Sequence, residues 1–403
     1  MNETAPPELD TESARRVTVA NVILDGRIGG PQRRIIEVAD RLKTTGWETL
    51  LVFPEMGSDL KRFAADRGVA CESLQLSRLR RENFFKSLLV LFVRFPLEVA
   101  RLVAIYRRHN VGLVHVNGVL TVQAIVSARI AGLPVVWHFN DMALPRGACR
   151  LWRFLFAPLV RVLVYSSERV REHYGGKTKR PETILYPPID MQRFDPALSG
   201  EAIPDELRLL RPRKDETILL SVGNINPLKG YEFLIDALRR LSGHCDPWRL
   251  VVIGMPLSTN KNYYSTLTRK LAENGLMDKV AFIGSTSHLV AAFAAADFVV
   301  VSSISESGPM VLTEALAMGK PVVSTDVGFA REVIRDGKNG FLVPAQNSRA
   351  LCTAIERLLI DRKLRERLAS AARESVPQAV RIDSVVEETR QVYRLAKFGR
   401  RAP

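Results

Sequence analysis

The sequence predicts an α/β protein with two domains, each built on a parallel β-sheet. At 403 residues the chain is long enough for two domains with separate cores. Residues 298–325 alternate an apolar run, a helix-forming run and a second apolar run, and strands joined in this way form a parallel βαβ unit. A strand, a glycine-containing loop and a helix follow one another twice, from residue 16 and from residue 217, in the order typical of nucleotide-binding domains.

The most informative helix start lies in residues 303–323, SISESGPMVLTEALAMGKPVV. Ser307 or Gly308 suits the N-cap of a helix, and Pro309 suits its first position, where no backbone N–H is needed. Gly319 fits the left-handed residue that ends a helix. Because this helix starts at the carboxyl edge of the sheet, its free N–H groups and its dipole favour a bound anion.

Two carboxylates, Glu306 and Glu314, flank this helix start with seven residues between them. Beside an anion site, an acid is useful when it accepts hydrogen bonds from hydroxyl groups. A ligand with both phosphates and hydroxyls, such as a sugar nucleotide, suits the pair. The alternative is that one acid only stabilises the helix dipole and the other is exposed.

A glycine-containing loop follows the first strand of each domain. Gly29 and Gly30 in the first loop would let the backbone approach a ligand closely, or would serve only a tight turn. In the second loop, Gly223 and Asn224 lead to Lys229. This lysine can neutralise a diphosphate as a point charge, or it is an ordinary solvated lysine.

Residues 133–141, LPVVWHFND, predict a buried strand with polar residues at its carboxyl end, where parallel sheets bind ligands. His138 is therefore a candidate site residue, and His115 and Asn117 hold a similar place on the preceding strand. The alternative for His138 is a structural histidine.

Residues 78–109 carry eight basic side chains and two acidic ones among many aliphatic and aromatic residues. Their charges exclude a membrane span, and Pro96 predicts a break into two helices. Such helices could lie on an anionic membrane surface, or form an ordinary surface helix with solvated charges. Residues 150–167 are a second candidate for lipid contact.

The remaining sequence features bear on compartment, cofactors and domain borders. The four cysteines have no C-x-x-C spacing, which argues against a zinc site or disulfides and suits a reducing cytosol. There is no D-x-D motif, so we expect no metal and no cofactor. The formal net charge of +15 favours anionic partners, but no nucleic-acid motif occurs, so we expect no nucleic-acid partner. No apolar run approaches 18 residues.

Six prolines between residues 180 and 215 indicate an interdomain linker. We therefore expect a disordered tail at 1–14, a first domain at 15–190 and a second at 191–379. Beyond Leu351 the pattern is helical without strands.

The E-x7-E spacing, the A-x-x-x-G-x-PVV that follows and GFAREVIRDGKNGFLVP at 328–344 closely resemble the retaining glycosyltransferases of family 4. The resemblance implies the GT-B architecture, with two Rossmann-like domains facing a cleft and a terminal helix, about 380–400, that crosses back to the first domain. It implies that Glu306 binds hydroxyls of the donor sugar and Glu314 the nucleotide ribose, and that His138 lies near that sugar. It also implies that Lys229 holds the diphosphate, while Asn224 stands where the family has an arginine. Further donor-binding residues implied by the resemblance are Gly29, Gly30, Gly223, Gly284, Ser285, Ser307, Gly308, Pro309, Met310 and Val311.

The function implied is transfer of a hexosyl unit from a nucleotide-diphosphate sugar, with retention and without metal, with Glu306, His138 and Lys229 as the catalytic set. The acceptor expected from the family is a glycan or a lipid-linked molecule of the bacterial envelope or of an exopolysaccharide. The enzyme would be cytoplasmic and peripheral on the inner face of the membrane, docked by the basic helices. A soluble acceptor and a non-catalytic relative that binds sugar nucleotides remain as alternatives, the second because of Asn224.

Overall fold

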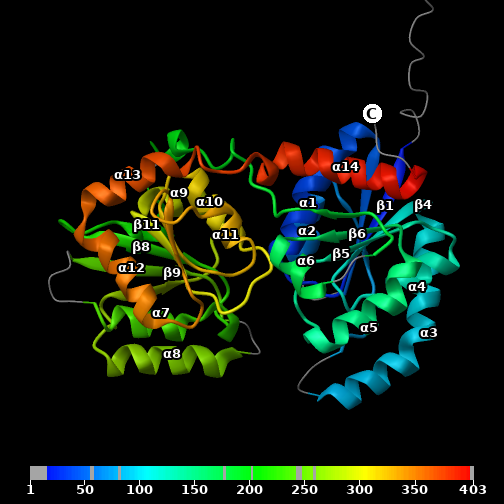
Figure 1. Cartoon of the computed structure of the whole chain (residues 1–403), viewed down its shortest axis with the longest axis horizontal. Coiled ribbons are helices and arrows are strands. Elements are labelled where there is room, and N and C mark those ends of the chain that lie inside the picture. Colours follow the sequence, from blue (N-terminus) through cyan, green and yellow to red (C-terminus); the bar gives the residue numbers. More distant parts are fainter. Residues whose placement is uncertain are drawn as a thin grey trace, which may run out of the picture. The chain divides into compact units, whose positions relative to one another are not determined.

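The computed structural model describes residues 16–54, 59–79, 83–175, 178–200, 203–241, 247–256 and 260–399. The tail expected at 1–14 lies outside these residues. The chain forms two compact units, and it passes from the first to the second between Leu185 and Tyr186 and returns to the first at Asp383. Each unit is α/β, as the sequence predicts (Figure 1).

The first unit is built on a seven-stranded, fully parallel sheet in the order β3-β2-β1-β4-β5-β6-β7. Its strands are β1 (Val17–Ile23), β2 (Trp47–Phe53), β3 (Ala70–Ser73), β4 (Val111–Asn117), β5 (Val135–Phe139), β6 (Val162–Tyr165) and β7 (Glu182–Ile184). Its helices are α1 (Gly30–Leu42), α2 (Asp59–Ala65), α3 (Phe84–Arg108), α4 (Val122–Ile130), α5 (Arg146–Phe156), α6 (Glu168–Tyr174) and α14 (Ile382–Phe398).

The second unit has a six-stranded parallel sheet in the order β10-β9-β8-β11-β12-β13. Its strands are β8 (Thr217–Val222), β9 (Trp248–Ile253), β10 (Val280–Ile283), β11 (Phe298–Val301), β12 (Val322–Thr325) and β13 (Gly340–Val343). Its helices are α7 (Tyr231–Leu238), α8 (Lys261–Glu273), α9 (Leu289–Ala295), α10 (Met310–Ala317), α11 (Ala330–Val333), α12 (Ser348–Ile360) and α13 (Arg362–Ala372).

Both sheets contain a point where the order of strand addition reverses. In the first unit this point lies between β1 and β4, and in the second between β8 and β11. The loops that leave neighbouring strands there run in opposite directions, which opens a crevice at the carboxyl edge where α/β proteins bind ligands. The loops after β1, β8 and β11 carry most of the site residues predicted from the sequence.

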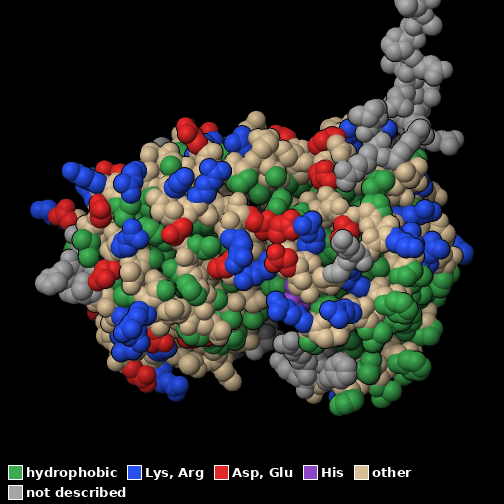
Figure 2. Space-filling view, in the orientation of Figure 1, with side chains coloured by type: hydrophobic (Ala, Val, Ile, Leu, Met, Phe, Trp, Pro, Cys, Tyr) green, Lys and Arg blue, Asp and Glu red, His purple; other side chains and the backbone are tan. Residues whose placement is uncertain are grey.

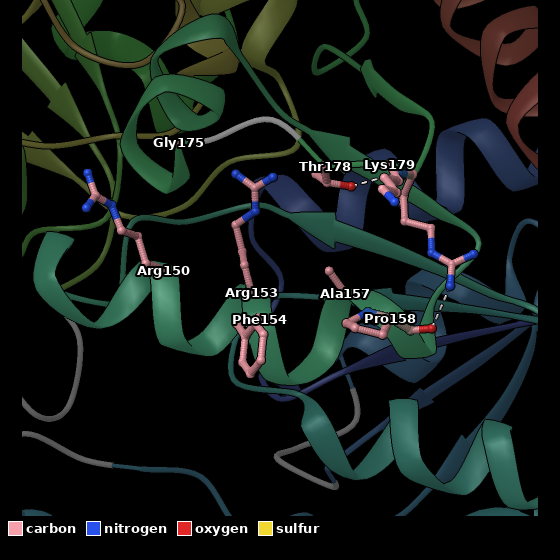
Figure 3. A pocket seen from close by; sticks show the side chains of 9 residues that line it. Arg150, Arg153, Phe154, Ala157, Pro158, Gly175, Thr178 and Lys179 are labelled. Atoms are coloured by element: carbon pink, nitrogen blue, oxygen red, sulfur yellow. Dashed lines mark hydrogen bonds between the residues drawn. The ribbon is translucent and has the colours of Figure 1, made fainter.

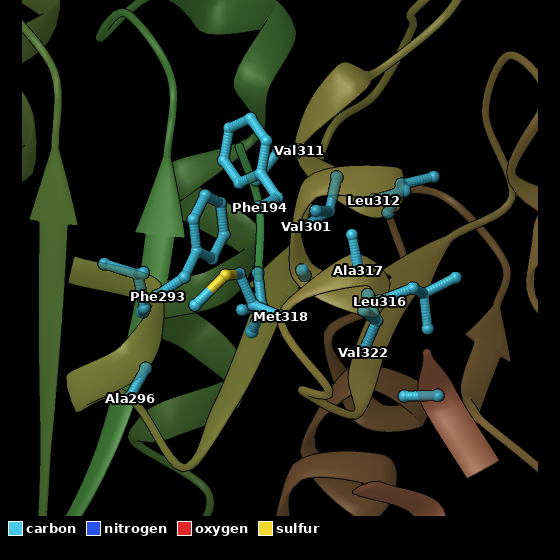
Figure 4. Close-up of a cluster of buried hydrophobic side chains, with 14 of the residues drawn as sticks. Phe194, Phe293, Ala296, Val301, Val311, Leu312, Leu316, Ala317, Met318 and Val322 are labelled. Carbon is cyan, nitrogen blue, oxygen red and sulfur yellow. The ribbon is translucent and has the colours of Figure 1, made fainter. Parts of the chain in front are cut away.

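The core of the second unit fixes the helix that starts at this edge. Leu312 and Leu316 of α10 are fully buried in a cluster with Phe293 of α9 and Val301 of β11 (Figure 4). A close-packed core resists displacement of its side chains, so the buried residues of α10 fix the position of the start of this helix.

The ends of two helices differ from the sequence prediction by a few residues. Helix α1 begins at Gly30, whereas the pattern of the sequence after the first strand predicts a helix around Arg33 to Lys43. Helix α10 begins at Met310, and Pro309 takes the N-cap place that we expected for Ser307 or Gly308. The left-handed Gly319 after α10 is confirmed, with φ of +68°.

The prediction that Pro96 separates two helices is wrong. Helix α3 runs without interruption through Pro96. A proline removes one backbone hydrogen bond, which a bend in a helix can accommodate. Two residues later the buried carboxylate of Glu98 accepts hydrogen bonds from Ser77 (Oγ to Oε1, 2.6 Å) and Gln123 (Nε2 to Oε2, 3.1 Å). These contacts and the buried Leu102 anchor the second half of α3 to the unit.

None of the helices that the structure describes has the length and apolarity required to span a bilayer.

Candidate functional site

The loops after β8 and β11 lie against each other at the carboxyl edge of the second sheet. The Ser302 hydroxyl donates to the Lys229 carbonyl (2.9 Å), and the Ile304 amide donates to the Leu228 carbonyl (2.8 Å). Gly230 is required at this junction, because a Cβ there would lie 2.3 Å from the Ser302 carbonyl oxygen, and its φ is +63°. The two loops therefore form one surface at the point where strand order reverses.

Lys229 and Glu306 meet across this junction. The Lys229 Nζ atom lies 2.7 Å from Glu306 Oε1, and the two side chains are 23% and 15% exposed. The Lys229 stem lies against Gly223, where a Cβ would come within 2.8 Å of the lysine Cε. Because Gly223 has no side chain, the lysine stem can occupy this position.

The Glu306 carboxylate is held through one oxygen only. Oε1 also accepts a hydrogen bond from Ser303 Oγ at 2.7 Å. Oε2 makes no hydrogen bond or salt bridge with the part of the chain that the structure describes. Because a carboxylate oxygen accepts more than one hydrogen bond, Glu306 keeps capacity for a ligand hydroxyl.

The turn that starts α10 is shaped by two glycines. At Gly308 a Cβ would lie 2.6 Å from Pro187 Cγ and 3.3 Å from Phe329 Cδ1. At Gly328, with φ of +52°, a Cβ would lie 2.8 Å from the carbonyl carbon of Ser307. The turn is thus enclosed by backbone and rings, and the first N–H groups of α10, which have no partner inside the helix, follow it directly.

The remaining predicted residues of this unit lie on the same edge in different surroundings. Glu314 is buried on α10, with 6% of its surface exposed. Asn224 is exposed in the loop after β8, and Gly284 and Ser285 are exposed at the carboxyl end of β10. Met310 and Val311 form the first turn of α10 after Pro309. All of these positions follow strands of one sheet or belong to α10.

In the first unit, the candidate residues lie around the reversal between β1 and β4. Gly29 is the N-cap of α1 and Gly30 its first residue. Arg34, one turn into α1, is buried, and its Nη2 donates to Asn117 Oδ1 at the end of β4 (2.7 Å). No salt bridge to Arg34 is formed within the described ranges, and burial lowers the pKa of its guanidinium to about 10, so it stays charged at neutral pH.

His138 is fully buried on β5 and belongs to a chain of three hydrogen-bonded side chains. Its Nδ1 lies 3.2 Å from His115 Nε2, and His115 Nδ1 lies 2.9 Å from the Tyr393 hydroxyl on α14. His138 Nε2 is buried and has no hydrogen-bond partner among the described residues. Burial, and next the charge of Arg34, hold the pKa of both imidazoles well below 6.5, so both are neutral.

The two hydrogen bonds of His115 couple the tautomers of the two histidines. Burial raises the pKa of Tyr393 to about 12, so its phenol keeps its hydrogen at neutral pH. Each neutral imidazole carries one proton, so when the Tyr393 hydroxyl donates to His115 Nδ1, His115 Nε2–H donates to His138 Nδ1. In that arrangement the proton of His138 is on Nε2, which is then a hydrogen-bond donor without a partner among the described residues.

Sequence reasoning did not identify several residues that shape these sites. Ser303 lies three residues from Glu306, a spacing that gives a usable signal. Tyr393 and Pro187 give none, because they contact the site from distant parts of the chain, and Arg34, four residues after Gly30, has its partner Asn117 on another strand.

Comparison with known proteins places these features in a family. The model described as "Glycosyl transferases group 1" matches residues 204–375, and the "Glycosyl transferase 4-like domain" matches residues 29–185. A D-inositol 3-phosphate glycosyltransferase of Thermomonospora curvata is 30% identical over 292 residues, which cover 66% of this chain and 67% of the relative.

Two further comparisons concern the length of the aligned region and the fold. An uncharacterized glycosyltransferase of Methanocaldococcus jannaschii is 31% identical over 235 residues, which cover 57% of this chain and 59% of the relative. The alignment therefore spans less than two thirds of that relative. The crystal structure of Anabaena HepE in complex with UDP and glucose superposes with a TM-score of 0.78 at 20% identity, covering 94% of this chain and 99% of HepE. This likeness shows that the two proteins share the fold.

Proposed function

Because the chain belongs to the group 1 glycosyltransferases, family 4 of the GT-B fold, we propose that it transfers a hexosyl unit from a nucleotide-diphosphate sugar with retention of configuration. The observation that carries this proposal is the Lys229–Glu306 pair at the strand reversal of the second unit. One cation and one hydroxyl acceptor lie 2.7 Å apart beside the start of a helix. This combination suits a ligand that has a diphosphate next to a sugar.

In this proposal the second unit binds the donor. Lys229 neutralises the diphosphate as a point charge, and the backbone N–H groups of residues 307, 308, 310 and 311 donate hydrogen bonds to it at the positive end of the α10 dipole. A lysine ammonium has three N–H donors, so Lys229 can bind phosphate while it remains paired with Glu306. Gly223 and Gly230 allow the lysine loop to lie close to the loop of Glu306.

The sugar and the nucleoside are positioned by acids and exposed backbone. Glu306 Oε2 accepts a hydrogen bond from a hydroxyl of the transferred sugar, and Glu314 orients the ribose. Gly284 and Ser285, exposed at the end of β10, lie beside the base. The first unit contributes Gly29 and Gly30 at the start of α1, and His138 Nε2–H as a donor to an oxygen of the sugar.

The chemistry that this arrangement favours is dissociation of the anomeric C–O bond. Charge develops on the departing diphosphate, and groups already oriented toward that charge lower the barrier most. Lys229 and the α10 amides supply this stabilisation, and the phosphate takes the proton of the acceptor hydroxyl on the same face of the sugar. Glu306 and Glu314 are positioning residues here, and no side chain serves as a covalent nucleophile. Neither a metal nor a cofactor has a role in the proposed reaction.

Asn224 departs from the family pattern, which has an arginine at this position. An exposed amide supplies no charge, so Lys229 and the dipole of α10 must balance the diphosphate without it. If they did not, the protein would bind sugar nucleotides without transferring sugar, which is the non-catalytic alternative.

We propose further that the acceptor is lipid-linked and that the first unit docks on the cytoplasmic face of an anionic membrane. Large apolar side chains on the first half of α3 are exposed, among them Phe85 (84%), Phe92 (80%) and Val93 (68%). Figure 2 shows the hydrophobic side chains gathered over α3. Exposed Lys86 and Arg94 lie among them. An apolar face with interspersed cations suits the interface of a bilayer with anionic lipid.

A soluble acceptor is the second candidate, and the relatives favour it. The relative from Thermomonospora curvata is named a D-inositol 3-phosphate glycosyltransferase, so an acceptor of that kind would be small and water-soluble. On this alternative the apolar face of α3 would not bind lipid. Co-sedimentation with anionic vesicles separates the two candidates, because only the lipid-linked candidate predicts binding that weakens with salt.

The proposed chemistry is tested first by a thermal-shift screen against a panel of nucleotide-diphosphate sugars. We expect at least one donor to raise the melting temperature, and we expect slow hydrolysis of that donor without acceptor. The shift should vanish in Lys229→Ala. If no donor stabilises the protein, the proposal is wrong, and a donor that binds but is neither hydrolysed nor transferred supports the non-catalytic alternative.

A further inference from the structure

The first unit contains a pocket of about 810 Å³ that the proposed chemistry does not use (Figure 3). It is lined by residues of α5, of the turn after α5 and of the segment that enters β7, and by Gly175 at the end of α6. Its size falls in the range of pockets that bind small molecules.

The pocket lies away from the proposed transfer site of the same unit. In a parallel α/β sheet, helices run opposite to the strands, so the end of a helix lies at the amino edge. The wall formed by Ala157 and Pro158 follows the end of α5, and the wall formed by residues 178–180 directly precedes β7. His138, by contrast, lies near the carboxyl end of β5. A ligand of this pocket would therefore be distinct from those of the proposed transfer site.

Among the described residues, the charged side chains that line the pocket are all basic. They are Arg150, Arg153, Lys179 and Arg180, and the part of the lining that the structure describes contains no acid. Arg153 is paired with Glu182 (Nη2 to Oε1, 3.1 Å), and Arg180 Nη2 donates to the Pro158 carbonyl (2.8 Å).

Two of the four cations keep their full hydrogen-bonding capacity. Arg150 and Lys179 form no hydrogen bond or salt bridge with any residue that the structure describes, and both are exposed. Two unpaired cations beside a fixed guanidinium attract an anion with several oxygens, such as a phosphate group.

One side of the pocket is apolar and continues onto the surface of the helix. Phe154 lines the pocket and is 78% exposed. Leu151 and Leu155, next to Phe154 on the outer surface of α5, are 61% and 49% exposed. A free inorganic anion would leave this apolar surface in water. A ligand with a phosphate and a hydrocarbon chain would cover it.

We infer that this pocket binds the phosphate headgroup of an anionic membrane phospholipid, with an acyl chain lying along Phe154 and Leu151. The inference rests on the membrane docking proposed above, and it assigns a discrete lipid site to a surface that would otherwise attract the bilayer only by its general charge.

The test separates a lipid pocket from general charge attraction. Dihexanoyl phosphatidylglycerol, used below its micelle concentration, serves as the monomeric ligand, and the melting temperature is the readout. We expect it to stabilise the wild-type protein, and we expect the apparent affinity to fall at least tenfold in Arg150→Ala/Lys179→Ala and in Phe154→Ser. Lys61→Ala/Arg62→Ala, which removes the same charge from exposed positions of α2, should bind as the wild type does.

Three outcomes would overturn the inference: equal binding in the wild type and the pocket variants, equal loss in the α2 control, and equal stabilisation by glycerol phosphate or inorganic phosphate. The last would indicate a phosphate site without a lipid. The shift produced by a nucleotide-diphosphate sugar, measured on the same variants, should stay unchanged. Loss of that shift in the wild type would refute the proposed function and leave the lipid measurement interpretable.

Discussion

His115 Nε2 lies 3.2 Å from His138 Nδ1, and the two imidazole rings stack with their centroids 5.3 Å apart. This contact joins two neighbouring strands to the last helix of the chain, because the other nitrogen of His115 is hydrogen-bonded to Tyr393. The tautomer of His138 is therefore coupled to a side chain of α14, more than 250 residues away in the sequence.

Removing the Tyr393 hydroxyl should slow sugar transfer, because the hydrogen bonds that orient His138 are then incomplete. In Tyr393→Phe, His115 loses the partner that fixes its tautomer, and we expect kcat to fall about two- to tenfold, in line with the loss of one hydrogen bond. KM for the donor should change less. Tyr264→Phe, on α8 of the second unit, serves as the control. An unchanged kcat in Tyr393→Phe would show that the chain of hydrogen bonds does not act on the reaction.

Acid should destabilise the first unit through the two buried histidines. Their pKa values are lowered in the folded state, mainly by burial, whereas an unfolded imidazole titrates near 6.5. Below about pH 6.5 the unfolded chain thus binds more protons than the folded one, so the free energy of unfolding falls as pH falls, by up to about 1.4 kcal/mol per pH unit for each histidine. Above that pH this contribution is fully present.

Chemical denaturation at several pH values between 5 and 7.5 measures this slope. The slope should decrease in His115→Asn/His138→Asn, even if that variant is less stable at every pH. His288→Asn, at an exposed position of the second unit, should leave the slope unchanged. Equal slopes in the wild type and the double variant would contradict the prediction.

Loss of either partner of the Lys229–Glu306 pair should abolish transfer while leaving the fold intact. Removing an oriented group that stabilises charge in the transition state costs about 10²- to 10³-fold in kcat, so Lys229→Ala and Glu306→Ala should lose at least this much. Circular dichroism and the melting temperature verify the fold. Wild-type rates in either folded variant would exclude the proposed donor site.

A second ion pair in the same unit provides the matched control. Arg249 and Glu216, 2.9 Å apart, are more deeply buried than Lys229 and Glu306, and Glu216 lies just ahead of β8, at the opposite edge of the sheet. Glu216→Gln leaves a buried guanidinium without its carboxylate, and breaking such a pair costs about 3–5 kcal/mol. We therefore expect a larger loss of stability than in Lys229→Ala, with kcat retained below the melting temperature.

A methyl group at Gly308 should disturb the start of α10. The new Cβ would lie 2.6 Å from Pro187 Cγ, and overpacking of this kind costs about 1–3 kcal/mol. Gly308→Ala should thus be less stable and bind donor more weakly, and Pro187→Ala in the same chain should restore part of the stability. Gly147→Ala on α5, where a Cβ meets nothing within 4 Å, should not destabilise the protein. No rescue by Pro187→Ala would show that the ring is not the obstacle.

Charge on the apolar face of α3 should reduce membrane binding without affecting the fold. Phe92 and Leu89 are 80% and 63% exposed, so Phe92→Glu/Leu89→Glu should leave the melting temperature unchanged and lower co-sedimentation with anionic vesicles at least tenfold. Met277→Glu, half-exposed in the second unit, is the control. Undiminished vesicle binding in the double variant would show that another surface binds the membrane.

The sequence by itself determined the α/β class, the strands and the loops that carry the candidate residues. These features are local: apolar runs of strand length, glycines between a strand and a helix, and the E-x7-E spacing depend on neighbouring residues. For that reason the order of residues alone places Lys229, Glu306 and His138 at the carboxyl ends of strands.

Only the tertiary structure decided what these residues contact. The pairing of Lys229 with Glu306 depends on the adjacency of β8 and β11, which are separated by two intervening strands in the sequence. The role of Tyr393 depends on the return of α14 to the first unit, and the continuity of α3 through Pro96 is supported by contacts of Glu98 with Ser77 and Gln123. Such contacts join residues far apart in the chain, and no local pattern records them.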